Sequence, residues 1–438
     1  MMKFDTDISH SLWQATAPNQ EARAFLSGTH ECDVAVIGGG YTGLSAALHL
    51  AEQGIDTCVL EAHHSGWGAS GRAGGQVNPA LPVATPDLLF KTMPHEFATR
   101  LAKASLGSAD FLFSLIKRHK IACDARQAGW IRAHHSHKAR QNAIISAAKW
   151  RDYGADFSLL DGARTKELTG STVYRSSLLT RAGGLVHPLK LAQGLAHAAI
   201  TYGAQIFENS PVTSLEPDAS GWQMRTHNGT LKSRFVIFAT NAYSGAFGED
   251  GRRYQNQLAK SIVRANPIQI ATEPLPPELA DSILPEGHSI SDSRRMILYA
   301  RREPDNRIVY GSIGQRTANG TLSGYEWLKR DAIRTFPQLE GVAWPYQWGG
   351  KIAITDTHLP HLTQLDNTII AGLGYNGRGV AMANLMGKIL ADYAMGTPPS
   401  VLPLPLLPPK RFFLGRIKQT GLNSYISIAK GLDWLDRR

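Results

Sequence analysis

The first eighty residues alternate between short apolar runs and a pattern typical of a helix. Asp33–Ile37 and Thr57–Leu60 are short apolar runs, and the small-residue helical pattern between them continues to about Gln53 and ends at Gly54. Apolar runs of this length are typical of buried parallel strands, and glycine often follows the last residue of a helix. The pattern therefore predicts a strand, a helix and a second strand at the start of a doubly wound α/β sheet.

The rest of the chain changes from a helical part to a strand-rich part and back. Residues 85–150 are mainly helical in pattern, and further helices are predicted at Pro188–Tyr202, within GYEWLKRDAIRTFP and after GYNGRGV. The predicted strands are Gly129–Ala133, Gln205–Glu208, Val212–Leu215, Trp222–Arg225, Phe235–Ala239, Ile262–Thr272, Met296–Arg301, Arg307–Gly311 and Asn367–Ala371. We expect the strands between 262 and 311 to form a separate sheet, and the others from residue 205 onward to rejoin the first.

Composition narrows the class of protein. The 438 residues are 43% hydrophobic and 19% charged, which is typical of a folded enzyme of two or three domains. The net charge of +10 is spread along the chain without a pattern of known nucleic-acid modules, so a solvated surface together with an anionic cofactor explains it better than a nucleic-acid partner. The three cysteines are widely spaced, and the clustered histidines lack accompanying carboxylates, so we expect neither a disulfide framework nor a metal site.

The sequence also contains neither the pattern of a signal peptide nor that of a transmembrane segment. The sequence MMKFDTDISHSLWQ has no apolar core of a signal peptide, and no run of about 18 apolar residues occurs. We therefore expect a cytoplasmic protein without a transmembrane segment.

The first glycine motif predicts a nucleotide site. Gly38, Gly40 and Gly43 form GxGxxG between the first strand and the helix, and Glu61 follows the second strand. The glycines allow a tight turn, a close approach of a pyrophosphate and close packing of helix on strand, while the acid can accept hydrogen bonds from a ribose diol. In this context the motif predicts dinucleotide binding, and the acid disfavours NADP.

A second glycine cluster distinguishes FAD from NAD. GASGRAGGQ begins seven residues after Glu61, where an NAD dehydrogenase would continue with a second helix of ordinary length. A glycine-rich extended loop instead indicates backbone that runs beside a flat, bulky ring, with Arg72 as a fixed positive charge. The later loop GLGYNGRGV precedes a helix, whose N-terminus would favour negative charge on the ring of a reduced flavin.

The order of these motifs resembles a known family. VIGGGYTG, LEA, GASGRAGGQ, GGLVHPLKLAQGL, FVIFATNAYS, WGGKIAITDTHLP and GYNGRGV occur in the order typical of the D-amino-acid oxidase and glycine oxidase superfamily. The chain is most similar to its gamma-glutamylputrescine oxidoreductase branch, which SLWQATA and the basic tail also resemble. The resemblance covers nearly the whole chain and implies an FAD enzyme that oxidises a C–N bond.

The resemblance also implies which residues contact FAD. Carried onto matching positions, the contacts are Gly38, Gly40, Thr42, Gly43, Glu61, Ser70, Arg72, Gly74, Gly75, Gln76, Val212, Ala239, Thr240, Gly374, Asn376, Gly377, Arg378, Gly379 and Val380. Ala73 stands where an asparagine is expected. Some members link the flavin to a cysteine or a histidine, but Gly349, Gly350 and Arg72 occupy those neighbourhoods here, so we expect non-covalent FAD.

The resemblance implies an α/β fold with a Rossmann-like FAD-binding domain and a substrate domain built on a mixed, largely antiparallel sheet. We divide the chain into a lead-in segment (1–30), a discontinuous FAD-binding domain (31–85, 150–245 and 342–400), a substrate domain (86–149 and 246–341) and a basic tail (401–438). We expect the lead-in to be irregular and the proline-rich tail to wrap the surface.

Candidate catalytic residues follow from the expected chemistry, in which a neutral amine gives a hydride to flavin and the resulting imine is hydrolysed. Arg301 could receive a carboxylate, Lys351 could promote oxygen reduction by its charge, and Tyr375 could face the substrate. We expect a small-molecule amine as substrate and O2 or another acceptor, without a nucleic-acid partner. Two alternatives stay open: an oxidase or deaminase of free amino acids, and a nucleic-acid-associated flavoprotein. The sequence does not predict the oligomeric state.

Overall fold

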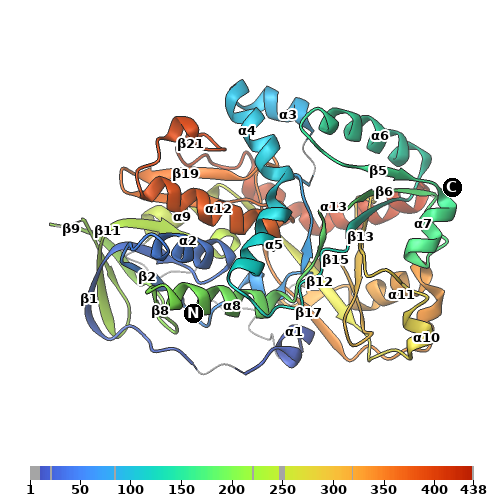
Figure 1. The fold of residues 1–438 in the computed structure, drawn as a ribbon, viewed down its shortest axis with the longest axis horizontal. Coiled ribbons are helices and arrows are strands. Elements are labelled where there is room, and N and C mark those ends of the chain that lie inside the picture. Colours follow the sequence, from blue (N-terminus) through green and yellow to red (C-terminus); the bar gives the residue numbers. More distant parts are fainter. Residues whose placement is uncertain are drawn as a thin grey trace.

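The computed structural model describes residues 10–19, 22–82, 85–219, 221–245, 252–317 and 319–436. Two large sheets lie side by side, the first on the left of Figure 1 and the second on the right. Among the described residues, no helix is both long enough and apolar enough to cross a membrane.

The first sheet is the predicted doubly wound sheet. Its strand order is β21-β19-β20-β11-β1-β2-β8, with β9 and β10 attached beside β11. The bounds are β1 (Gly28–Ile37), β2 (Thr57–Leu60), β8 (Gln205–Phe207), β9 (Ser214–Asp218), β10 (Gly221–Arg225), β11 (Gly229–Phe238), β19 (His361–Asp366), β20 (Ile369–Leu373) and β21 (Leu406–Leu407). Because β1, β2, β8, β11 and β20 are parallel neighbours, their carboxyl ends meet at one edge of the sheet.

The second sheet is mixed and largely antiparallel, as predicted. Its order is β17-β12-β15-β14-β13-β4-β6-β5, and only β13 and β4 pair in parallel among these neighbours. The bounds are β4 (Trp130–His134), β5 (Ser158–Leu160), β6 (Ser176–Thr180), β12 (Val263–Ala271), β13 (Ser289–Asp292), β14 (Tyr299–Arg302), β15 (Ile308–Arg316) and β17 (Tyr346–Gly349). The short strands β16 (Leu322–Ser323) and β18 (Ile352–Ile354) pair with β15 and β12, and β3 (Gln76–Val77) pairs with β7 (Gly184–Leu185).

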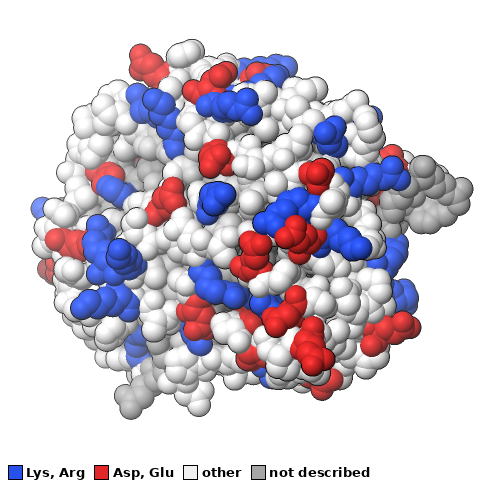
Figure 2. All heavy atoms as spheres, turned by 45° about the vertical axis from the view of Figure 1, so that its right-hand side comes forward, with Lys and Arg blue, Asp and Glu red and all other residues white. Residues whose placement is uncertain are grey.

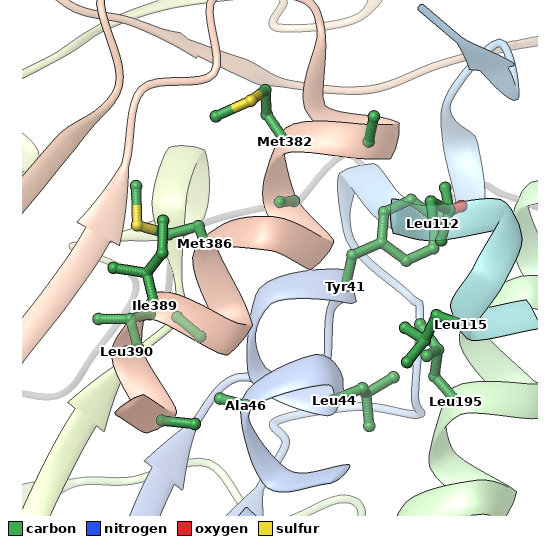
Figure 3. Packing of buried hydrophobic residues seen from close by; sticks show 14 of the residues in the cluster. Tyr41, Leu44, Ala46, Leu112, Leu115, Leu195, Met382, Met386, Ile389 and Leu390 are labelled. Atoms are coloured by element: carbon green, nitrogen blue, oxygen red, sulfur yellow. The ribbon is translucent and has the colours of Figure 1, made fainter. Parts of the chain in front are cut away.

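Helices cover both sheets. The remaining bounds are α1 (Leu12–Thr16), α2 (Tyr41–Ala51), α3 (Pro86–Thr92), α4 (His95–Leu106), α5 (Ser108–Arg118), α6 (His137–Arg151), α7 (Gly162–Thr169), α8 (Pro188–Thr201), α9 (Arg252–Lys260), α10 (Pro277–Ala280), α11 (Tyr325–Thr335), α12 (Gly379–Ala394) and α13 (Gly415–Leu435). Helix α2 is buried along its whole length. Figure 3 shows Leu44 of α2 near Leu115 and Leu195, with Met382 and Met386 of α12 on the other side. This packing fixes the two helices that begin at the glycine loops.

The two ends of the chain differ from our predictions. The lead-in is not wholly irregular, because it contains the short helix α1, which Ser11 caps. Leu12 and Trp13 of this helix are buried, and the Trp13 indole N–H donates to the carbonyl oxygen of Ala73 at 2.9 Å. The tail is not only a surface wrap, because it contains the 21-residue helix α13. Residues Ile426 and Ala429 of α13 pack with Met296 of the second sheet's β13–β14 connection, a contact that no local pattern predicts.

The predicted domain boundaries also need correction. Strands β5 and β6, which we placed in the FAD-binding domain, pair with β4 in the second sheet, and β17 and β18 pair with β12 there. Strand β13 (Ser289–Asp292) was not predicted, because two serines and an aspartate give it no apolar run. The observed β9 and β14 begin two and three residues after the predicted strands at Val212 and Met296.

Candidate active site

One large cavity lies between the two sheets. Its volume is ≈1220 Å³, and it extends from Ile37 and Leu60, at the carboxyl ends of β1 and β2, to the β13–β14 connection and α13. All three glycine motifs contribute to its lining. A crevice at the carboxyl ends of parallel strands is where doubly wound sheets bind their ligands.

The first motif forms a tight turn into α2. Gly38 has φ +111°, a conformation that residues with a side chain rarely adopt. A Cβ atom on Gly43 would lie 1.9 Å from the carbonyl oxygen of Gly38, so only glycine fits at the start of this helix. Gly40 and Thr42 line the cavity at the N-terminus of α2. This turn is a site for the phosphates of a dinucleotide.

Glu61 follows β2 at the edge of the cavity. Its Oε2 atom accepts a hydrogen bond from Gly39 N–H at 2.6 Å, and its Oε1 atom accepts one from His63 N–H at 2.9 Å. Burial raises the pKa of the carboxyl group, while these hydrogen bonds favour the ionised form. The two oxygens keep further acceptor capacity, which a ribose diol could use.

Neighbouring protein atoms explain why GASGRAGGQ contains glycines. A Cβ atom on Gly71 would lie 2.3 Å from the Gly66 carbonyl oxygen, and one on Gly75 would lie 2.2 Å from Nη1 of Arg301. We had attributed this cluster to the close approach of a flavin to an extended loop. That explanation is incomplete, because Ala69–Arg72 forms a 3₁₀ turn and the rest of the loop is pressed against the second sheet.

Arg72 lines the cavity and is itself buried. Its Nε atom donates to the Trp67 carbonyl oxygen at 3.0 Å, and its guanidinium lies 4.7 Å from the centre of the Trp67 ring. The buried Nη2 atom has no hydrogen-bond partner among the residues that the structure describes. A buried donor without a partner costs free energy, so a bound acceptor at this position would be stabilising.

The third motif joins β20 to α12. Asn376 has φ +52° and Gly377 has φ +93°, and the Asn376 Oδ1 atom accepts a hydrogen bond from Thr355 N–H at 2.9 Å. Asn241, also at positive φ, accepts a hydrogen bond from Gly374 N–H at 3.0 Å. Sequence reasoning missed Thr355 and Asn241, whose role in holding this loop arises only from the fold.

Most predicted cofactor residues lie together. Those that line the cavity are Gly38, Gly40, Thr42, Glu61, Ser70, Arg72, Gly74, Gly75, Gln76, Val212, Ala239, Thr240, Asn376, Gly377, Arg378, Gly379 and Val380. Gly43 and Gly374 are outside the lining, and their role is to shape the backbone, since a Cβ atom at either would clash with its surroundings.

The three candidate catalytic residues have different environments. Lys351 and Tyr375 line the cavity, whereas Arg301 does not. Tyr375 is hydrogen-bonded to Thr42 through their hydroxyl groups at 2.6 Å, and burial raises its pKa above the usual range. The Nζ atom of Lys351 lies 5.6 Å from the centre of the Tyr243 ring.

Arg301 is not available to receive a substrate carboxylate. It is almost fully buried, forms an ion pair with the buried Glu303, and donates to the carbonyl oxygens of Gly74 at 3.2 Å and Val186 at 2.7 Å. The prediction that Arg301 receives a carboxylate is therefore wrong. Arg301 instead links the second sheet to the GASGRAGGQ loop. The position of Arg301 at a strand end gave no signal of this role.

The rest of the cavity lining comes from parts of the chain that the sequence did not mark. It includes Arg132, Tyr243, Gln269, Ser291, Asp292, Met296 and Tyr299, and residues Leu422, Tyr425 and Ile426 of α13. These residues come from several strands, a 3₁₀ turn and the C-terminal helix. Since no short motif contains them, only the fold brings them together.

The residues present fit FAD. The cavity joins a glycine turn at a helix N-terminus, an acid after the second strand, and a buried arginine donor without a protein partner. A dinucleotide with an extended ring system matches this sequence of a phosphate site, a ribose acceptor and a wide hollow between the two sheets.

Comparison with known proteins agrees with this geometry. The chain is 34% identical over 394 residues to gamma-glutamylputrescine oxidoreductase of Escherichia coli (strain K12), covering 89% of this chain and 90% of that protein. The fold is similar to glycine oxidase from Geobacillus kaustophilus, with a TM-score of 0.67, 20% identity and coverage of 84% and 95% of the two chains. It is also similar to L-amino acid deaminase from Proteus myxofaciens, with a TM-score of 0.69, 16% identity and coverage of 89% and 96%.

The family assignment follows from the same comparison. Residues 33–393 match the family described as FAD dependent oxidoreductase, a span that contains all three glycine motifs and every strand of the two large sheets except the start of β1 and all of β21. The chain therefore belongs to the family of FAD dependent oxidoreductases, and FAD is its cofactor.

Proposed function

We propose that this protein oxidises the C–N bond of an amine that resembles gamma-glutamylputrescine. The observation that carries the proposal is the 34% identity to gamma-glutamylputrescine oxidoreductase over nearly the full length of both chains. The large cavity supports it, because an extended amine needs space beyond the cofactor, between the second sheet and α13.

The chemistry divides between cofactor and protein. When bound, FAD supplies the acceptor for the hydride of the amine carbon. The protein positions the amine and excludes water, with Met296, Tyr299 and Ile426 in the cavity lining on the side of the second sheet and α13. The glycine loops, the second sheet and α13 all contribute residues to the lining around this space.

Lys351 is proposed to speed reoxidation when O2 is the acceptor. It follows Gly350, whose backbone lies beside Arg72, and it lines the same cavity. A fixed positive charge stabilises the negative charge that develops as oxygen is reduced. In Lys351→Met we expect reoxidation by air to slow by about tenfold or more, while reduction by the amine stays within about twofold, as measured by stopped-flow spectroscopy. Equal reoxidation rates would remove this role.

Non-covalent binding of FAD is also proposed. The cysteines Cys32, Cys58 and Cys123 are all buried, and none of them is among the described residues that line the cavity. Release of intact FAD from acid-precipitated protein would support the proposal, and flavin that stays with the protein would contradict it. The three free thiols also fit the cytoplasmic location that we expect.

Nucleic-acid binding has less support. On the face shown in Figure 2, Lys and Arg side chains are interspersed with Asp and Glu. Many of the basic residues are held in ion pairs, among them Arg234 with Asp33 and Lys190 with Asp124. A nucleic-acid site would need a basic surface that follows the phosphate backbone.

The experiment is a comparison of products. Purified holoenzyme is incubated in air with gamma-glutamylputrescine, putrescine, sarcosine, glycine, and D- and L-amino acids, and the products are identified by mass spectrometry. We expect an aldehyde from gamma-glutamylputrescine or a close analogue at the highest kcat/KM. A keto acid from a free amino acid as the best product would favour the amino-acid oxidase alternative and contradict the proposal.

A further inference from the structure

Arg132 lies in the cavity without a counter-ion. It is the middle residue of β4, between Ile131 and Ala133, and it lines the cavity on the side of the second sheet. It makes no hydrogen bond or ion pair with any residue that the structure describes. Burial alone lowers its pKa, and no carboxylate contributes to offset this effect.

A second arginine lies close to the first. Arg378 donates to the carbonyl oxygens of Pro79 at 2.9 Å and Leu81 at 3.0 Å, and its guanidinium lies 4.6 Å from the centre of the Trp130 ring. Burial, and then the positive charge of Arg132, lower the pKa of Arg378 to about 9. Both arginines also line an adjacent cavity of ≈370 Å³. Two cations therefore lie near each other, and no described carboxylate pairs with either of them.

Two buried arginines on the side of the second sheet, by contrast, are paired. Arg294 forms ion pairs with Asp292 and Asp331, and Arg301 forms one with Glu303. A buried charge without a partner is costly, so the protein neutralises these two guanidinium groups with its own carboxylates. Arg132 and Arg378 differ from them because they line the cavity and no described carboxylate pairs with either of them.

We propose that Arg132, with Arg378 beside it, binds a carboxylate of the substrate at the end remote from the amine that is oxidised. The proposal rests on the function proposed above and deepens it, since it assigns the residues that select an amine with a carboxylate remote from the reacting end. A guanidinium group binds a carboxylate through two parallel hydrogen bonds, and the anion would also reduce the repulsion between the two arginines.

A hydroxyl group completes this subsite. The Ser291 Oγ atom accepts a hydrogen bond from the Trp130 indole N–H at 2.9 Å, which leaves its own proton for another acceptor. Ser291 is paired with Arg132 in the register of β13 and β4, so the two residues lie next to each other in the sheet. A carboxylate has enough acceptor sites for both side chains.

The test uses FAD-saturated full-length enzyme and two amines of similar length. One is gamma-glutamylputrescine, which carries a carboxylate, and the other is N-butanoylputrescine, which does not. In Arg132→Gln we expect kcat/KM for gamma-glutamylputrescine to fall by about 10- to 100-fold, mainly through KM, with N-butanoylputrescine changed less than about twofold. Arg132→Lys, which keeps the charge but not the paired geometry, is expected to restore part of the loss.

Lys138→Gln is the matched control. Lys138 is an exposed cation that lines the adjacent cavity but is not part of the lining of the large one. It should leave the preference for gamma-glutamylputrescine unchanged. A loss of preference in Lys138→Gln equal to that in Arg132→Gln, or an equal fall for both amines in Arg132→Gln, would overturn the proposal.

A binding measurement separates this proposal from the function on which it rests. Glutarate is titrated into wild-type and Arg132→Gln holoenzyme by calorimetry, and we expect the variant to bind it at least about tenfold more weakly. If the wild-type enzyme oxidises neither amine, the proposed function fails and glutarate binding alone decides on the carboxylate subsite. Equal binding by both proteins, or none by the wild-type enzyme, would then overturn the subsite.

Discussion

The two walls of the cavity are built in different ways. On the side of the first sheet, glycine loops lead into α2 and α12, and the backbone itself forms the surface. On the side of the second sheet, large and charged side chains from β4, β13, β14 and α13 form the surface. The first wall depends on the absence of side chains at a few positions, whereas the second depends on contacts between residues far apart in the chain.

This difference suits two tasks: binding a cofactor that is always the same, and selecting a substrate that can vary. A backbone cradle suits a cofactor whose phosphates and ring are always the same. Side chains on a sheet and a terminal helix can be exchanged without changing the fold, which suits the selection of a substrate. Substitutions in the first wall should therefore abolish cofactor binding, whereas substitutions in the second wall should change the stability of the protein or its selectivity for substrates.

The largest effect is expected at Gly43. In Gly43→Ala the new Cβ atom would lie 1.9 Å from the Gly38 carbonyl oxygen, which forces the turn below the phosphate site to open. We expect loss of most of the bound FAD after gel filtration, measured as the ratio of flavin to protein absorbance. Gly431→Ala is the control, because no atom lies within 4 Å of the added group and alanine favours the helix α13. Full retention of FAD in Gly43→Ala would contradict the claim that the glycine turn before α2 holds the phosphates of FAD.

The next effect concerns the link between the walls. Arg301→Ala leaves the buried Glu303 without its partner and removes the donors to Gly74 and Val186. We expect the free energy of unfolding in urea to fall by about 3–5 kcal/mol. Arg302→Ala on the same strand is the control, because its partner Asp281 is exposed and the loss should be about 1 kcal/mol or less. Equal losses would show that the link does not hold the walls together.

A smaller effect is expected where α13 docks. Asp433 accepts hydrogen bonds from the backbone N–H groups of Arg295 at 3.0 Å and Met296 at 2.8 Å. Asp433→Asn should loosen α13, so we expect faster hydrogen exchange of its amides and a KM several-fold higher, with FAD still bound. Asp436→Asn, which removes an exposed ion pair with Arg295, should change neither. Loss of FAD in Asp433→Asn would contradict the separation of the two walls.

The smallest effect is a dependence of stability on pH at His187. The Nδ1 atom of His187 accepts from Lys190 N–H at the start of α8, and burial lowers its pKa to about 3. The unfolded chain takes up this proton near pH 6.5, so the stabilisation is complete above about pH 6.5 and is lost as the pH falls towards 3. Between about pH 7.5 and pH 5, the wild-type protein should lose about 2 kcal/mol more than His187→Asn, which keeps a helix cap.

Urea unfolding at the two pH values measures this difference. His197→Asn is the control, since His197 lies exposed on the same helix and should leave the pH dependence as it is. An unchanged pH dependence in His187→Asn would contradict the role of the buried imidazole.

The sequence predicted the first wall better than the second, for a physical reason. Gly38 and Gly43 are required by the conformation of a few neighbouring residues, so a short motif contains the whole constraint. Glu61 likewise follows a strand whose apolar run is plain in the sequence. These positions could therefore be assigned to a nucleotide site before the fold was known, and Gly38 and Glu61 do line the cavity.

The second wall could not be predicted in this way. Arg301 and Arg132 are both arginines on neighbouring parts of one sheet, yet the first is paired with Glu303 and the second faces the cavity. Helix α13 depends on Asp433 and on contacts with Met296, which lies more than a hundred residues away in the chain. Pairing and packing across such separations are decided by the tertiary structure and leave no local pattern.

The central claim is that the cavity holds FAD and an amine that reduces it. The most direct measurement is the visible spectrum of the purified holoenzyme under anaerobic conditions, before and after addition of gamma-glutamylputrescine. The account predicts a yellow protein whose oxidised flavin band disappears with the amine and returns when an electron acceptor is admitted. A colourless protein that takes up no FAD, or a flavin band that no amine bleaches, would contradict it.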